Sequence, residues 1–185
     1  MKKDSNNKKL RYLSHREFDR LNSISKNNRD DLILSMLYET GCTVNELVNI
    51  KNSHFNFEKN ILSIRGKHAR NKEHRNVFIS SVLIKKIKEF QKSNTISDYL
   101  LFTRQSGSMT TKRICQLVKK YCKLAGLTEF TPQILRYTHI VYAYEKNIPL
   151  DSIRKQVGLK RSRAIELFSQ LPKKESPDAY RNFMG

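Results

Sequence analysis

The stretch that decides the fold is TPQILRYT, at residues 131–138, followed by VGL at residues 157–159. Thr131 and Pro132 predict a helix start, because the threonine hydroxyl can cap the helix and proline fits the first turn, whose N–H groups lack a helical partner. The glycine of VGL separates two further helical patterns. The C-terminal part of the chain is therefore predicted to form three short helices, starting at about residues 131, 150 and 162.

Upstream of this stretch, apolar residues recur mainly at helical spacing. Ser14 and Glu17 form a capping box that opens a first helix. Residues 60–65 and 75–79 instead alternate apolar and polar on either side of a basic turn, which predicts a small antiparallel hairpin. Other helical patterns lie at about 29–39, 44–50, 82–90 and 110–124. The predicted fold class is mainly α with a small antiparallel β-hairpin or sheet.

Composition divides the chain into three segments. Residues 1–11 are polar and cationic and are expected to form a basic flexible arm. Residues 12–171 are long enough for one sizeable domain with its own core. Pro172 stops the last predicted helix, so residues 172–185 are expected to form a C-terminal tail.

Charge is the strongest compositional signal. Lys and Arg number 36 against 17 Asp and Glu, which gives a net charge of +19. Such a surplus repels itself and is tolerated most easily when a polyanion neutralises it, so nucleic acid is the expected partner. The absence of a long apolar run or a basic amphipathic anchor argues against a membrane partner. The three cysteines and five histidines show no metal spacing, so we expect no metal, no cofactor and a reduced cytoplasmic location.

Three stretches, in this order, resemble the tyrosine recombinase (phage integrase) family. TGCTVNEL at 40–47 is similar to the family's TGxRxSEL box, and GKHARNKE at 66–73 is similar to its GKGNKER turn. TPQILRYT…VGL resembles the family's PHxLRHT…LGH segment, and the 23 positions from Arg136 to Leu159 match that pattern without a gap. The resemblance implies the fold of a tyrosine-recombinase catalytic domain over nearly the whole chain after the arm.

The family's chemistry assigns a role to each motif position. A tyrosine attacks a DNA phosphodiester and forms a 3′-phosphotyrosyl link, while two arginines and two histidine-like donors hold the phosphate and a hairpin lysine protonates the leaving oxygen. The resemblance places the lysine at Lys67 and the second arginine at Arg136. The other positions fall on Thr43 for the first arginine, Gln133 for the first histidine, Leu159 for the second histidine and Phe168 for the nucleophile.

These four departures indicate a degenerate catalytic site. Phe168 has no oxygen to attack phosphorus, and Leu159 cannot form a hydrogen bond. Loss of each phosphate-binding group costs on the order of 10²–10³ in rate. The sequence therefore predicts a protein that binds DNA without cutting it and is not an enzyme. The alternative is an active short recombinase with an unconventional nucleophile, for which Tyr180 is the candidate.

Basic residues on several predicted elements are candidates for DNA contact. A charged turn is often only a solvated surface, Arg136 could be a satisfied core arginine, and Gln133 could contact a phosphate or a base edge. The expected DNA-binding residues are Lys67, Arg70, Lys72, Arg75, Lys112, Arg113, Gln133, Arg136, Lys160, Arg161 and Arg163.

The function predicted first is a sequence-specific regulator of double-stranded DNA, namely a repressor from a phage or mobile element. The second alternative, besides the active recombinase, is a non-catalytic partner of an active recombinase. In the family the C-terminal tail docks on a neighbouring subunit. The resemblance therefore implies a homo-oligomer on DNA through the tail, with Phe183 and Met184 as anchors.

Overall fold

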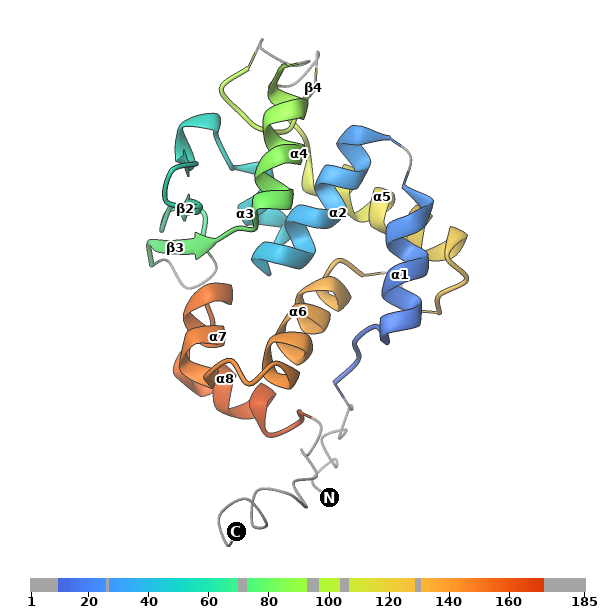
Figure 1. Ribbon diagram of the computed structural model, residues 1–185, viewed down its shortest axis with the longest axis vertical. Helices are drawn as coiled ribbons and strands as arrows, with labels where there is room; N and C mark the ends of the chain where they lie inside the picture. Colours follow the sequence, from blue (N-terminus) through green and yellow to red (C-terminus); the bar gives the residue numbers. More distant parts are fainter. Residues whose placement is uncertain are drawn as a thin grey trace, which may run out of the picture.

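Helices make up most of the residues that a computed structural model of this chain describes, which are 10–25, 27–69, 73–92, 97–103, 107–128 and 131–171 (Figure 1). The α-helices are α1 (His15–Ile24), α2 (Asn28–Thr40), α3 (Val44–Val48), α4 (Ser81–Lys92), α5 (Thr111–Leu124), α6 (Gln133–Glu145), α7 (Leu150–Val157) and α8 (Arg161–Phe168). The remaining elements are a 3₁₀ turn, η1 (Asn52–His54), and five short strands, β1 (Phe55–Asn56), β2 (Ile61–Ile64), β3 (Arg75–Phe78), β4 (Phe102–Thr103) and β5 (Gly107–Ser108). The predicted fold class is confirmed. Within the described ranges, none of the helices has the length and apolar content needed to span a membrane.

Side-chain caps fix where the first two helices begin. The predicted capping box of α1 is present, because the Ser14 N–H donates to Glu17 at 2.8 Å and the Glu17 N–H donates to the Ser14 hydroxyl at 3.3 Å. In α2 the Asn27 side-chain oxygen accepts from two backbone N–H groups of the first turn. Each bond satisfies a donor that the helix itself leaves unpaired.

The start of α6 differs from its prediction by one residue. The helix begins at Gln133, and Pro132 occupies the N-cap position without a side-chain cap bond. Thr131 contributes its backbone carbonyl instead, which accepts from the Ile134 N–H at 3.1 Å. Proline lacks an N–H, so it is tolerated at the cap as well as in the first turn.

Strands β1, β2 and β3 form an antiparallel sheet in that order. β2 pairs with β3 from Ile61 opposite Phe78 to Ile64 opposite Arg75, which confirms the predicted hairpin. The sequence did not predict β1 or the β4–β5 pair, because a strand of two residues is too short to show an alternating pattern.

Two apolar clusters form the interior, and α6 contributes to both. Residues 134–135 of α6 belong to the larger cluster, together with the sheet and α2, α4 and α5. Residues 140–141 belong to the smaller cluster with α7 and α8. Arg136 and Thr138 are buried polar residues of α6 and lie in sequence between these two groups. In Figure 1, α6 lies between α2 on one side and the α7–α8 pair on the other.

Most residues of the two expected terminal segments lie outside the described part of the chain. Leu10 is buried in the smaller cluster, and Arg11 donates a hydrogen bond to the Thr128 hydroxyl. The expected arm at 1–11 therefore does not extend to these two residues. Its other residues and the expected tail at 172–185 lie outside the part of the chain that the structure describes.

Candidate nucleic-acid interface

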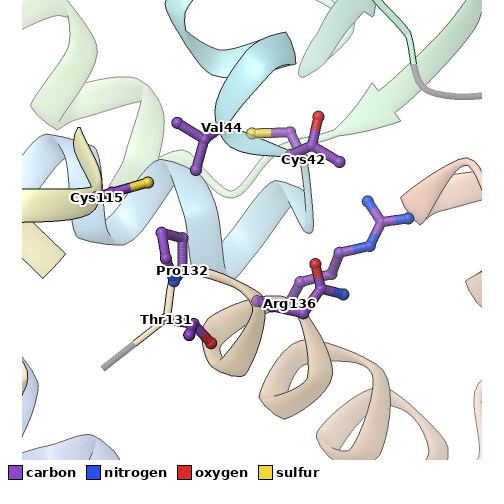
Figure 2. A pocket seen from close by; sticks show the side chains of 8 residues that line it. Cys42, Val44, Cys115, Thr131, Pro132 and Arg136 are labelled. Atoms are coloured by element: carbon purple, nitrogen blue, oxygen red, sulfur yellow. The ribbon is translucent and has the colours of Figure 1, made fainter. Parts of the chain in front are cut away.

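A small cavity lies where the start of α6 meets the turn between α2 and α3 and the side of α5 (Figure 2). Its volume is about 180 Å³. It brings together positions from two separate motifs of the sequence, Thr43 from the box at 40–47 and Gln133 and Arg136 from the segment at 131–138. The residues that line it are Cys42, Thr43, Val44, Cys115, Thr131, Pro132, Gln133 and Arg136.

Arg136 is both a buried residue and part of the cavity wall. It is 2% exposed, and its Nη1 donates a hydrogen bond to the backbone carbonyl of Gly41. Gly41 ends α2 with φ at +56°, where residues with a side chain are strained. A Cβ at this position would also lie 2.6 Å from Cγ1 of Val157. A glycine is therefore needed at position 41 to present the backbone carbonyl that binds Arg136. Contact of Arg136 with a DNA phosphate remains a prediction.

His139, one turn after Arg136 on α6, is a half-buried neutral imidazole. Burial lowers the pKa of His139 to about 4, and the positive charge of Arg136 acts in the same direction. Its ring lies edge-on to Tyr38 of α2, with the ring centroids 6.1 Å apart. The sequence assigned no role to this residue, and its neutrality avoids a second positive charge next to the guanidinium.

Thr43, where the family pattern has an arginine, caps α3. Its hydroxyl accepts from the Glu46 N–H at 3.2 Å, and its own N–H donates to Glu46 Oε2 at 2.7 Å. This reciprocal pair is a capping box. Thr43 thus has a structural reason to be a threonine at the edge of the cavity.

Arg75 lies in the interior, although the sequence predicted a DNA contact. Its Nη1 and Nη2 donate to the two carboxylate oxygens of Glu46, at 2.7 and 3.0 Å. The two side chains are 8% and 1% exposed. Burial alone raises the pKa of Glu46, but the hydrogen bonds and charge of Arg75 outweigh it, so the pKa lies below its ordinary value. The structure therefore corrects the expectation for Arg75, because its guanidinium is already occupied by a carboxylate.

The hairpin turn keeps Lys67 at the surface. Lys67 is exposed, and the carbonyl oxygen of the next residue, His68, accepts from Asn45 Nδ2 at 3.2 Å. Asn45 belongs to α3, the helix that Thr43 caps, so this bond holds the turn beside the element that borders the cavity. Arg70 and Lys72, also predicted here, lie outside the described residues. Phosphate contact by Lys67 remains a prediction.

Two family positions lie away from the cavity. Leu159 is buried in the smaller cluster, and Phe168 is half-buried against the same cluster. Neither belongs to the cavity wall. Both pack as ordinary apolar side chains, as their residue types favour.

The other predicted contacts are exposed on two helix starts. Lys112 and Arg113 lie in the first turn of α5, where positive charge opposes the helix dipole and gains stability from an anion nearby. Lys160 and Arg161 are exposed at the start of α8, and Arg163 in the same turn forms an ion pair with Glu166. Contact of these residues with DNA remains a prediction.

Sequence reasoning missed the two cysteines of the cavity. The sequence pattern gives Cys42 and Cys115 no role, because the cysteines show no metal spacing. Figure 2 shows their sulfur atoms on opposite sides of Val44, one from the α2–α3 turn and one from α5. The Cys42 thiol is buried, and burial raises its pKa to about 12, so it remains protonated. No local pattern connects these residues, because they lie on different elements.

Known proteins similar to this chain are site-specific recombinases. The tyrosine recombinase XerA of Pyrococcus horikoshii is 29% identical over 171 residues, which cover 90% of this chain and 59% of that protein. The tyrosine recombinase XerC of Oceanobacillus iheyensis is 23% identical over 181 residues, which cover 91% of this chain and 59% of that protein. The chain therefore spans somewhat more than half the length of these relatives.

Solved recombinase structures share the fold. A crystal structure of XerA recombinase superposes on the whole chain, and on 67% of its own, with a TM-score of 0.79 at 21% identity. A post-cleavage complex of XerH with a palindromic difH substrate superposes on the whole chain, and on 56% of its own, with a TM-score of 0.81 at 17% identity. The predicted fold, that of a tyrosine-recombinase catalytic domain, is thus confirmed.

The relatives correct one prediction about activity. Four departures from the family pattern led to the expectation that the chain is not an enzyme, namely those at Thr43, Gln133, Leu159 and Phe168. That expectation is contradicted, because the relatives are named tyrosine recombinases. A phenylalanine at one position excludes that residue as the nucleophile, but it does not exclude a hydroxyl from elsewhere.

The family assignment covers nearly all of the folded part. Residues 11–174 match the phage integrase family. The match includes the box at 40–47, the hairpin and the helix that carries Arg136. This chain therefore belongs to the phage integrase family.

Proposed function

We propose that this chain binds double-stranded DNA and acts on it as a tyrosine recombinase, cleaving and rejoining strands through a phosphotyrosyl intermediate. The observation that carries this proposal is the cavity in which Gln133 and Arg136 meet the cap of α3. A guanidinium held in a cavity wall suits a phosphate, because it is planar, permanently charged and rich in N–H donors. The similarity to named recombinases supports the same function.

In the proposed reaction, Arg136 and Gln133 hold the scissile phosphate. The bond from Arg136 to the Gly41 carbonyl orients the guanidinium before DNA arrives, which lowers the cost of ordering it. Lys67, on the hairpin turn beside α3, protonates the 5′-oxygen as the P–O bond to it breaks.

The nucleophile is a tyrosine oxygen, which forms the new bond to phosphorus and leaves a 3′-phosphotyrosyl link. Phe168 has no hydroxyl, so another tyrosine supplies this oxygen. Our candidate is Tyr180, 12 positions after Phe168. It lies outside the described residues, and its assignment is part of the proposal.

Trapping the covalent intermediate tests this function. The chain is first mixed with sheared DNA from its own source, and the retained fragments are sequenced to find its sites. Nicked duplexes of those sequences then lose a short fragment after cleavage, so the phosphotyrosyl adduct accumulates. We expect a denaturant-resistant adduct with the wild-type chain and none with Tyr180→Phe, whereas Tyr144→Phe is the control. Specific binding without an adduct would contradict the proposed strand cleavage, but it would still support the proposed DNA binding.

We also propose that the chain regulates transcription of a phage or mobile element from the same sites. This role is compatible with recombination, because a protein that binds its sites for strand exchange also occupies them between reactions. The net charge of +19 and the exposed Lys112 and Arg113 favour occupancy that does not depend on cleavage. Enrichment of promoter-proximal inverted repeats in the sequenced fragments would support it, and enrichment at element junctions alone would contradict it.

Assembly on DNA through residues 172–185 completes the proposal. Phe183 and Met184 are the apolar anchors that we expect to dock on a neighbouring subunit. A chain that ends at Leu171 should bind one site with nearly unchanged affinity and lose higher-order complexes in mass photometry. Identical complexes with and without the tail would contradict this part.

A further inference from the structure

A side chain from α7 covers the outer edge of β3. In the sheet order β1–β2–β3, β3 is an edge strand, which exposes backbone groups on its outer side. The Phe78 N–H donates to Gln156 Oε1 at 3.1 Å, and Gln156 Nε2 donates to the Phe78 carbonyl at 2.9 Å. One glutamine amide thus satisfies both backbone groups of Phe78, as a neighbouring strand would.

The start of β3 is bound to the same helix by Arg75. Its Nε donates to the backbone carbonyl of Gln156 at 3.2 Å, while its two terminal nitrogens bind Glu46. The guanidinium also lies against the turn that ends α7, since a Cβ at Gly158 would lie 2.6 Å from Arg75 Nη1. Both ends of β3 are therefore fixed to the last turn of α7.

This arrangement makes α7 a rigid link between two groups of the proposed site. The β2–β3 hairpin carries Lys67 in its turn, and the next residue of that turn, His68, is bound by Asn45. On its other side, α7 packs against α6, the helix that carries Arg136. In Figure 1, α7 lies directly beside β3 and next to α6.

We propose that Gln156 is a positioning residue, which holds the hairpin so that Lys67 and Arg136 grip the same DNA phosphate. Charge-assisted hydrogen bonds depend steeply on distance and angle, so two groups on separate elements need a fixed spacing to share one phosphate. Gln156 supplies that spacing through the two Phe78 bonds. This inference rests on the proposed function, because it requires Lys67 to contact DNA.

A double-mutant cycle in DNA binding tests the role. Wild-type chain, Lys67→Ala, Gln156→Leu and the double variant are titrated with a labelled mixed-sequence duplex over a range of KCl concentrations. Loss of one phosphate contact lowers the slope of log affinity against log salt by about 1. We expect Gln156→Leu to weaken binding roughly threefold to tenfold and to lower this slope toward that of Lys67→Ala. The double variant should bind no more weakly than Lys67→Ala.

The matched control is Gln170→Leu, since the Gln170 amide bonds only to the Glu166 carbonyl one turn earlier among the described contacts. It should keep the wild-type affinity and salt slope. An unchanged slope for Gln156→Leu, or additive losses in the double variant, would overturn the positioning role. A wild-type chain that does not bind the duplex would overturn the proposed function as well, so the two failures are distinguishable.

A second variant keeps the test decisive if Gln156→Leu unfolds, as judged by its thermal transition. In Gln156→Glu, the carboxylate still accepts from the Phe78 N–H but opposes the Phe78 carbonyl without a donor. Protonation at low pH restores that donor. The ratio of its affinity to that of wild type, measured at each pH, should therefore rise toward one as the pH falls. A ratio that stays constant with pH would contradict the role.

Discussion

At the scale of single residues, burial decides which charges matter for the fold. Glu46 and Arg75 are almost completely buried as a pair, whereas in the pair of Lys51 with Asp98 the side chains are 39% and 85% exposed. Water screens the second pair, so it contributes little to stability. Removing one partner of the first pair leaves the other charge buried and uncompensated.

Glu46→Gln should therefore lower the free energy of unfolding by about 3–5 kcal/mol. Asp98→Asn, the exposed control, should change it by less than about 1 kcal/mol. Equilibrium urea denaturation measures both. Equal losses in the two variants would show that burial of the Glu46–Arg75 pair has no energetic consequence.

The neutral His139 makes stability depend on pH. Its folded-state pKa, about 4, lies below the unfolded value of about 6.5, so the unfolded chain takes up the proton first as the pH falls. The contribution of His139 to the free energy of unfolding is fully present above pH 6.5 and is lost as the pH falls toward 4. Between pH 7 and pH 5 the loss should be about 2 kcal/mol. His139→Phe should remove this part of the pH dependence of urea denaturation, and an unchanged pH dependence would contradict the assignment.

At the scale of elements, the fold depends on close contact at the helix ends. The end of α2 touches α7 at Gly41, and that contact presents the carbonyl that binds Arg136. The end of α7 touches Arg75 at Gly158 in the same way. Both glycines have a positive φ, and at both a neighbouring atom leaves no space for a Cβ. Backbone conformation and close packing therefore both require glycine at these positions.

Gly41→Ala and Gly107→Ala separate these requirements. Gly107 also has a positive φ, at +70°, but nothing lies within 4 Å of the position of its Cβ. Gly107→Ala should therefore lower the free energy of unfolding by about 1–2 kcal/mol, through backbone strain alone. In Gly41→Ala the new methyl group also overpacks against Val157, so the free energy of unfolding should fall by about 2–5 kcal/mol in all. Similar melting temperatures for the two variants would show that α7 moves away from α2 at little cost.

At the scale of the whole molecule, the net charge of +19 makes binding to a polyanion strongly dependent on salt. The position of each charge matters as well as the total. Lys112 is exposed in the first turn of α5, whereas Lys155 on α7 forms an ion pair with Asp151 at 2.8 Å. The two lysines contribute equally to net charge, but only Lys112 is a predicted phosphate contact.

Lys112→Ala should lower the salt slope of duplex binding by about 1 and weaken binding uniformly across sequences. Lys155→Ala, which changes the net charge by the same amount, should leave the slope close to that of the wild-type chain. Fluorescence titrations at several salt concentrations measure both. Equal slopes for the two variants would indicate that total charge alone governs binding.

The amino-acid sequence by itself determined the local elements and the order of the motifs. The capping box at Ser14, the helix predicted at about 29–39 and the hairpin of β2 and β3 follow from short local patterns of residue types. The motifs around Thr43, Lys67 and Arg136 pointed to the family because their order and spacing are linear properties of the chain. The prediction about activity was wrong, because it rested on four single positions of the family pattern, whereas the relatives of the whole chain are named tyrosine recombinases.

Only the tertiary structure decided which polar groups meet. Arg75 was expected at the DNA surface, yet it binds Glu46, 29 positions earlier, and Gln156 binds Phe78 from 78 positions away. A guanidinium or an amide can satisfy its hydrogen bonds with water, DNA or another part of the chain, and its neighbours in sequence do not choose among these. The tertiary fold determines the partner, because a buried polar group must form its hydrogen bonds with the groups that packing brings within about 3 Å.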